Sequence, residues 1–107
     1  MTTSVYHAKR EHFRDTQFFG HEDIVKRQDI IDGFDDKSMY EMVGFVRTDD
    51  LDVAYQLTNH IAHNWTTNPE VEAHGPTQRS TSIGDILIND NGVFVVSSVG
   101  FELLRAA

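Results

Sequence analysis

The turn signal at residues 89–92 constrains the fold of this chain more than any other feature. This segment ends in Asn91-Gly92 and separates two short apolar runs, 86–88 and 93–96, that are rich in β-branched residues. An Asn-Gly pair suits a type I′ turn, and a three-residue loop with glycine in a bulge is equally possible. Both loops join antiparallel strands, so the sequence predicts a β-hairpin here.

A second run of strand-forming residues covers 40–48. Met42 and Val46 are expected on one side of this strand, and Val43 and Phe45 on the other. Because apolar residues occupy both faces, we expect a central strand with neighbours that cover both sides.

A helix from about 50 to 64 should follow this strand. The segment 48–50, Thr-Asp-Asp, supplies an N-cap residue and acids that favour the positive end of the helix dipole. At about 100° per residue, one side of the helix collects Leu51, Ala54, Tyr55, Thr58, Ile61, Ala62 and Trp65. This apolar stripe is wide enough to cover one face of a sheet.

The first third of the chain has weaker patterns. Residues 4–13 are expected to form a polar-rich strand. A short helix around 24–31 should end at Gly33, and residues 35–38 should form a loop.

The C-terminal part completes the predicted fold. Residues 71–74 are expected to form an edge strand, and Leu103 and Leu104 to pack as a final anchor. The elements together predict an α+β fold in a single domain, 1–107. A small, mainly antiparallel sheet would carry one principal amphipathic helix, about 50–64, and the C-terminal β-hairpin.

Charge and composition exclude several classes of function. Seventeen acidic residues against nine basic ones give a net charge of -8, which opposes direct binding of nucleic acid or of an anionic membrane. The chain has no cysteine, so disulfides and thiolate metal sites are excluded. No long apolar run or secretory signal is found in the sequence, so a cytoplasmic location is expected.

An acidic stretch follows the basic beginning of the chain. Four of its acids, Asp29, Asp32, Asp35 and Asp36, are candidates for binding a basic protein surface. The alternative is a solvated face without a partner. Imitation of nucleic acid is a minor alternative, because the charge density falls short of one charge per about 1.7 Å of duplex axis.

Two groups of residues carry the other candidate chemistry. Arg79 with Ser80 and Ser82 could hold a phosphate or carboxylate. Alternatively this segment is a structural turn, in which Ser82 and Asp85 bond backbone amides and Gly84 takes a positive φ.

Asn59 flanks the apolar stripe and is predicted either to contact a ligand or to satisfy backbone groups. His60 and His63 lie three residues apart, but they lack the zinc-helix spacing, so solvated histidines are favoured over a metal site. No catalytic residue, metal or cofactor is expected, because the chain has no Gly-x-Ser-x-Gly elbow and no carboxylate pair in a buried setting.

Several spaced motifs occur in a familiar order: Arg47-Thr48-Asp49-Asp50-Leu51, Leu57-Thr58-Asn59-His60-Ile61, Trp65, Asn68, Arg79-Ser80-Thr81-Ser82-Ile83-Gly84-Asp85 and Val99-Gly100-Phe101. Over roughly residues 40–104 the chain resembles small uncharacterised proteins carried by phages, plasmids and some bacteria. The Arg-Ser-Thr-Ser-x-Gly-Asp and Gly-Phe elements also resemble the YodL-like domain of mobile elements.

This resemblance implies an accessory protein of a phage or mobile element that binds a host or defence protein. If the family uses one surface, the matching positions here are Asn59, His60, Trp65, Arg79, Ser80 and Ser82. We therefore expect a non-enzymatic binding protein. The alternatives are a protein that binds a small phosphate or nucleotide, or a weak hydrolase, and a homodimer is possible through Phe18 and Phe19.

Overall fold

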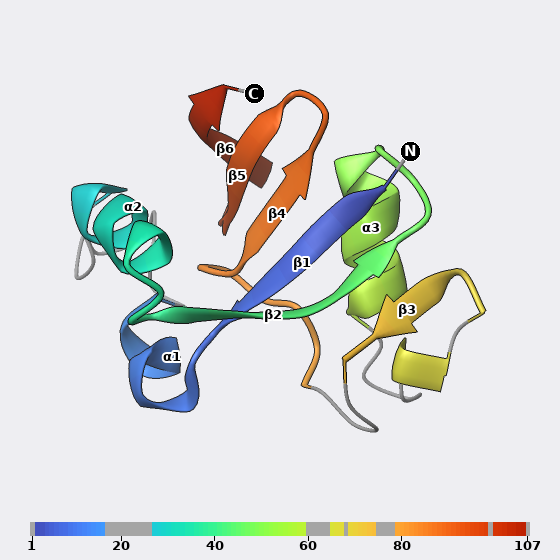
Figure 1. The fold of residues 1–107 in the computed structure, drawn as a ribbon, viewed down its shortest axis with the longest axis horizontal. Helices are drawn as coiled ribbons and strands as arrows, with labels where there is room; N and C mark the ends of the chain where they lie inside the picture. The colour runs from blue at the N-terminus through green and yellow to red at the C-terminus, as the bar shows by residue number, and fades with distance from the viewer. Residues whose placement is uncertain are drawn as a thin grey trace.

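A six-stranded antiparallel sheet forms the centre of the computed structural model, with the strand order β3-β2-β1-β4-β5-β6 (Figure 1). The structure describes residues 2–16, 27–59, 65–67, 69–74, 79–98 and 100–106. The elements are β1 (Thr3–Ala8), α1 (Arg10–Thr16), α2 (Arg27–Asp35), β2 (Tyr40–Val46), α3 (Leu51–Thr58), the 3₁₀ turn η1 (Trp65–Thr67), β3 (Val71–Ala73), β4 (Ile86–Asn89), β5 (Gly92–Ser97) and β6 (Gly100–Ala106). The predicted α+β class and antiparallel sheet are thus confirmed.

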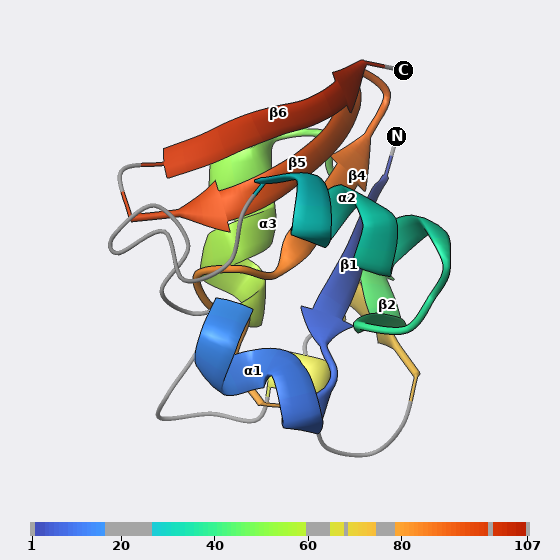
Figure 2. The ribbon, with the colours of Figure 1, turned by 90° about the vertical axis from the view of Figure 1, so that its left-hand side faces the viewer.

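Helices cover both faces of the sheet, rather than the one face that the sequence predicts. In Figure 2, α2 lies in front of the sheet and α3 behind it. The core on the α3 side includes Val5, Val46 and Trp65. The core on the α2 side includes Ile30 and Ile86. Two apolar faces explain why β1 and β4, in the middle of the sheet, are buried along most of their length.

The β4–β5 hairpin forms at the predicted turn, with a loop that differs from both expected types. Asn89 pairs with Gly92, so Asp90 and Asn91 form a two-residue loop. Among the described non-glycine residues only Lys37 has a positive φ, and a type I′ turn needs two. A Cβ at Gly92 would lie 2.5 Å from the carbonyl oxygen of Arg105, so the close approach of β6 requires glycine at this position.

Strand β2 lies between β1 and β3, as its apolar residues predict. A register shift interrupts the alternation of side chains between the two faces of β2. Val5 pairs with Gly44, whereas the next residue, Tyr6, pairs with Met42. Val43 and Val46 consequently both join the core on the α3 side. The prediction that they face opposite sides is therefore wrong, because a bulge adds one residue to the alternation.

The first third differs most from the prediction. Only the beginning of the expected strand at 4–13 is extended, because α1 starts at Arg10. Gly33 does not end α2, which continues to Asp35. A Cβ at Gly33 would lie 2.2 Å from Met39 Sδ, so glycine is needed there for close packing. The left-handed position after the helix is taken instead by Lys37, with φ 63°.

Helix α3 begins where the sequence predicts and ends earlier. The Asp50 carboxylate caps it by accepting the amide hydrogens of Asp52 and Val53. The helix ends at Thr58, whose carbonyl oxygen accepts a bond from the Thr81 amide. Trp65 therefore does not lie on the helix, although it is buried as expected.

The C-terminal residues form the edge strand β6 rather than a short anchor. Leu104 is buried, but Leu103 is 43% exposed, so only one of the two predicted anchor residues packs in the core. The predicted edge strand at 71–74 is confirmed as β3, which pairs only with β2. No helix in the described part of the chain is long and apolar enough to span a membrane.

Candidate functional site

The predicted ligand residue Arg79 is held in an ion pair with a fully buried carboxylate. Its two terminal nitrogens lie 2.6 and 2.7 Å from the two oxygens of Asp85. The same nitrogens donate to the carbonyl oxygens of Ser80, at 3.0 Å, and of Ala8, at 3.1 Å. The guanidinium also lies 4.2 Å from the centroid of the Phe13 ring. This bidentate pair ties the segment 79–85 to the end of β1.

Asp85 accepts backbone bonds as well as the guanidinium. Its Oδ1 atom accepts from the Ala8 amide and its Oδ2 atom from the Ser82 amide, each at 2.8 Å. Gly84 has φ 91° and passes so close to α1 that a Cβ would lie 2.2 Å from the Thr16 carbonyl oxygen. The interpretation of this segment as a structural turn is thus supported for Asp85 and Gly84.

His7 is a buried titratable residue beside this pair. Its Nε2 atom lies 2.9 Å from Thr81 Oγ1 and 4.0 Å from Asp85 Oδ2, and its ring packs edge-on to Trp65. Burial lowers the pKa of His7 to about 4, although the Asp85 carboxylate acts in the opposite direction. Among the described buried side-chain atoms, only His7 Nδ1 has no hydrogen-bond partner. The ring is therefore neutral at pH 7 and held by packing and a single hydrogen bond.

Several other predicted ligand residues lie around the same turn. The indole nitrogen of Trp65 donates to the Arg79 carbonyl oxygen at 2.8 Å. Asn59 is the C-cap of α3, and its backbone N–H donates to the Gln56 carbonyl oxygen. This bond is made by the Asn59 backbone, so it decides neither of the two roles predicted for the side chain, ligand contact or satisfaction of backbone groups. His60 lies outside the described residues, as does His63.

The chemistry left to Arg79 is limited by these partners. Four polar contacts engage its terminal nitrogens, and a buried carboxylate opposes its charge. A cavity of about 280 Å³ beside it is lined by Ala8, Arg10, Phe13, Glu41 and Arg79. A phosphate here would compete with Asp85 for the guanidinium, so the geometry favours a structural role for Arg79.

The predicted partner-binding acids lie in or just after α2, and all four are exposed. Asp35 forms a bidentate ion pair with Arg105 in β6, at 2.7 and 3.2 Å. The bonds from the Arg105 guanidinium lower the pKa of Asp35. Asp32 accepts from the Gln28 amide at 2.9 Å, and bonds from Ser38 lower the pKa of Asp36.

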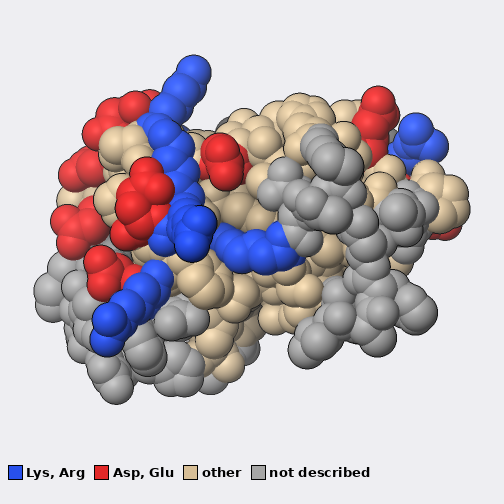
Figure 3. All heavy atoms as spheres, turned by 90° about the horizontal axis from the view of Figure 1, so that it is seen from below, with Lys and Arg blue, Asp and Glu red and all other residues tan. Residues whose placement is uncertain are grey.

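A second ion pair also attaches α2 to the sheet. Arg27 forms a 2.6 Å ion pair with Glu102 and donates to the carbonyl oxygen of Leu103. Together with the Arg105 pair, this contact covers part of the outer edge of β6 and orients the helix. Figure 3 shows acidic side chains gathered at the end of the molecule where α2 lies in Figure 1, with a band of basic side chains beside them.

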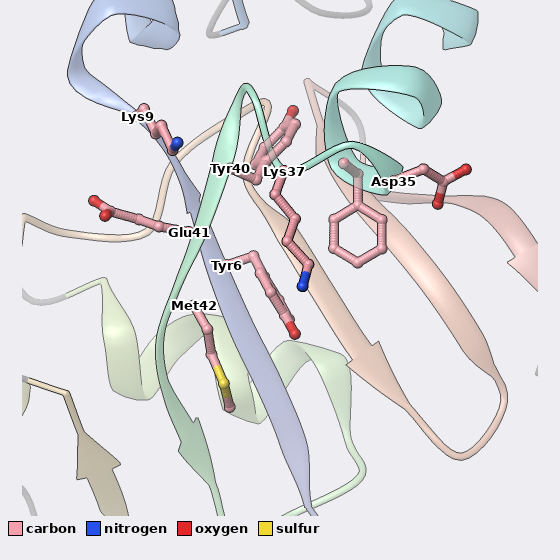
Figure 4. Close-up of a pocket in the computed structure, with 8 residues that line it drawn as sticks. Tyr6, Lys9, Asp35, Lys37, Tyr40, Glu41 and Met42 are labelled. Carbon is pink, nitrogen blue, oxygen red and sulfur yellow. The ribbon is translucent and has the colours of Figure 1, made fainter.

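A larger cavity opens between the end of α2 and the strands β1 and β2 (Figure 4). It has a volume of about 540 Å³, within the range of about 300–1,000 Å³ that holds small ligands. Aromatic rings, one methionine and four charged side chains line it: Tyr6, Phe34, Tyr40, Met42, Lys9, Lys37, Asp35 and Glu41.

Most of these lining residues were not candidates on sequence grounds, because they come from three separate segments. The one sequence signal is the spacing of two of the three lysines of an acidic chain, because Lys9 lies three residues after Tyr6 and Lys37 lies three residues from both Phe34 and Tyr40. Within the described ranges, no group of three histidine or acidic residues is arranged to hold a metal ion.

Comparison with known proteins identifies no relative of this chain. No family model, curated protein or solved structure matches it.

Proposed function

We propose that this protein is a non-enzymatic binding protein that contacts a basic surface of a protein partner through the exposed side of α2. The observation that carries the proposal is a ridge formed by Asp29, Asp32 and Asp36. These residues are three and four positions apart, which places them along one side of the helix and its C-terminal turn. All three are exposed, so the ridge is accessible to a partner.

The attachment of α2 supports this proposal. Arg27 and Arg105 hold the helix on the edge strand β6, and Arg105 neutralises Asp35. Asp35 therefore contributes less to the proposed interface than it would without this ion pair. A helix that is already ordered loses less conformational entropy when a partner binds than a disordered acidic segment would.

The resemblance to proteins of phages and to the YodL-like domain suggests the setting of this function. On that basis we propose that the protein is encoded by a phage or mobile element, acts in the bacterial cytoplasm and binds a host or defence protein. The excess of acidic residues makes a basic protein a more favourable partner than nucleic acid or an anionic membrane.

The alternative functions have less support. A phosphate site at Arg79 would have to displace the Asp85 carboxylate from the guanidinium. Imitation of nucleic acid would need a longer row of charges than the ridge provides. A homodimer through Phe18 and Phe19 concerns residues outside the described ranges.

Capture from a bacterial lysate with two matched variants tests the proposal. The first variant replaces the ridge acids by asparagine (D29N/D32N/D36N), and the second removes the same charge elsewhere (D15N/D52N/D90N). We expect one basic protein to be retained by the wild type and the second variant, and lost with the first. Retention should also decrease at high salt, because exposed charge pairs are screened. Equal retention by both variants would contradict the proposal.

A further inference from the structure

We infer that the cavity between α2, β1 and β2 binds a small planar aromatic anion with the chemistry of a nucleoside monophosphate. The inference concerns a different surface from the acidic ridge and does not depend on the proposed partner. Three features of the cavity carry it: a continuous aromatic wall, two polar groups without partners among the described residues, and an unusual backbone conformation at Lys37.

The aromatic wall consists of three rings, of which the Phe34 ring contacts the other two. The ring centroids of Tyr6 and Phe34 are 5.1 Å apart, and those of Phe34 and Tyr40 are 6.3 Å apart, both edge-to-face. Met42 adds a polarisable side chain beside them. Because the rings pack against one another, they form a preordered surface on which a planar ligand can stack.

Two donor groups of the cavity have no partner in the described part of the chain. Among the described residues, the Tyr6 hydroxyl makes no hydrogen bond and Lys37 forms no ion pair. In contrast, Arg27, Arg47 and Arg105 are all in ion pairs. Figure 4 shows the Lys37 ammonium and the Tyr6 hydroxyl extending in the same direction. An anionic group can accept from both.

Of the other charges of the cavity, one is opposed by an ion pair, and the remaining two have opposite signs. Asp35 is paired with Arg105, so the guanidinium offsets part of the repulsion between this carboxylate and a bound anion. Lys9 and Glu41 lie on the same side of β2 in Figure 4 and carry opposite charges. The ammonium of Lys37 is consequently the charge that selects an anion. Tyr40 serves only as wall, because its hydroxyl donates to the Gly84 carbonyl oxygen at 2.5 Å.

The backbone at Lys37 also points to a function for its side chain. This residue has φ 63°, a conformation that glycine adopts without the steric cost paid by a residue with a Cβ. The fold alone would be served as well by glycine at this position. Non-glycine residues in this conformation persist only where the surrounding structure holds them, and they cluster at ligand and active sites.

Calorimetric titration of the purified protein with adenosine monophosphate, adenosine and inorganic phosphate tests the inference. We expect adenosine monophosphate to bind, adenosine to bind at least tenfold more weakly because it lacks the anion, and phosphate alone to show no binding because it lacks the ring. Absence of binding by adenosine monophosphate, or equal affinity for adenosine, would overturn the inference.

Three variants locate the site. Lys37→Gly removes the ammonium at a position that tolerates glycine, so the fold should be retained while the affinity for adenosine monophosphate falls at least tenfold. Tyr6→Phe keeps the ring and removes the hydroxyl, and a smaller loss of affinity is expected. Arg47→Ala, which removes one positive charge from β2's far end, should bind like the wild type. An equal loss of affinity in Lys37→Gly and Arg47→Ala would show that only net charge matters and would overturn the assignment of the site to this cavity.

Discussion

Replacement of Asp85 by asparagine tests the role of the buried ion pair most sharply. The Oδ1 atom of Asp85 accepts from the Ala8 amide and from one terminal nitrogen of Arg79. Its Oδ2 atom accepts from the Ser82 amide and from the other terminal nitrogen. An asparagine amide keeps one oxygen and replaces the second with a donor. Whichever way it is oriented, two donors of the protein therefore face an NH₂ group instead of an acceptor.

The magnitude follows from these lost bonds. A buried donor without a partner costs about 1–3 kcal/mol, and breaking a buried ion pair costs about 3–5 kcal/mol. The Arg79 side chain is 30% exposed, so water relieves part of this cost. We expect Asp85→Asn to lower the free energy of unfolding by about 3 kcal/mol, a large fraction of the roughly 5–15 kcal/mol typical of a domain.

Urea unfolding followed by the fluorescence of Trp65 measures this change. Trp65 is the only tryptophan of the chain and bonds to the Arg79 carbonyl oxygen, so it reports on the same region. A lower midpoint with an unchanged slope is expected. Asp35→Asn is the matched control, because its ion pair is exposed and should contribute much less. A loss below about 1 kcal/mol in Asp85→Asn would refute the reasoning.

Two further predictions concern buried backbone and ring groups. Because the pKa of His7 is about 4 in the folded protein and 6.5 in its ordinary state, the unfolded chain binds a proton first as the pH falls. Stability is therefore expected to decrease between about pH 6.5 and pH 4, by on the order of 3 kcal/mol, and urea midpoints of His7→Gln should lack this part of the decrease. If the two proteins lose stability in parallel, His7 is not the group responsible. Gly84→Ala places a Cβ 2.2 Å from the Thr16 carbonyl oxygen, whereas Gly100→Ala meets nothing within 4 Å. Both glycines have a positive φ, so both substitutions cost stability through backbone strain, and the clash adds to this cost only at Gly84. Thermal unfolding should therefore show a larger loss for Gly84→Ala than for Gly100→Ala, and similar midpoints would contradict the close approach.

The elements that the sequence predicts correctly depend on local interactions. The Asp50 cap satisfies amides two and three residues away, and the β4–β5 hairpin closes over four residues, 89–92. Such signals are contained in short segments, so they can be recognised without knowledge of the rest of the fold.

The features of the fold that the sequence does not predict depend on distant contacts. Gly33 would ordinarily end a helix, but here close packing of Met39 requires a residue without a Cβ. The expected helix to residue 64 ends at Thr58, where the chain bonds to Thr81. The local sequence contains no sign of either contact.

The same reason limits what the sequence shows about the candidate sites. The hydroxyls and the cation of the segment 79–82 are visible in the sequence. The Asp85 carboxylate that pairs with the Arg79 cation also accepts from the Ala8 amide, which lies 77 positions away. The cavity behind the further inference joins Tyr6, Phe34 and Lys37 from three segments, and only the folded sheet and α2 bring them together.

Hydrogen exchange of the protein in complex with its captured partner tests the central claim most directly. The account predicts slower exchange in the peptide that covers residues 27–36, with the β4–β5 hairpin unchanged. The D29N/D32N/D36N variant, incubated with the same partner, should show no protection of that peptide. Protection confined to residues 79–98, or equal protection of α2 in the variant, would contradict the assignment of the binding surface to the acidic ridge.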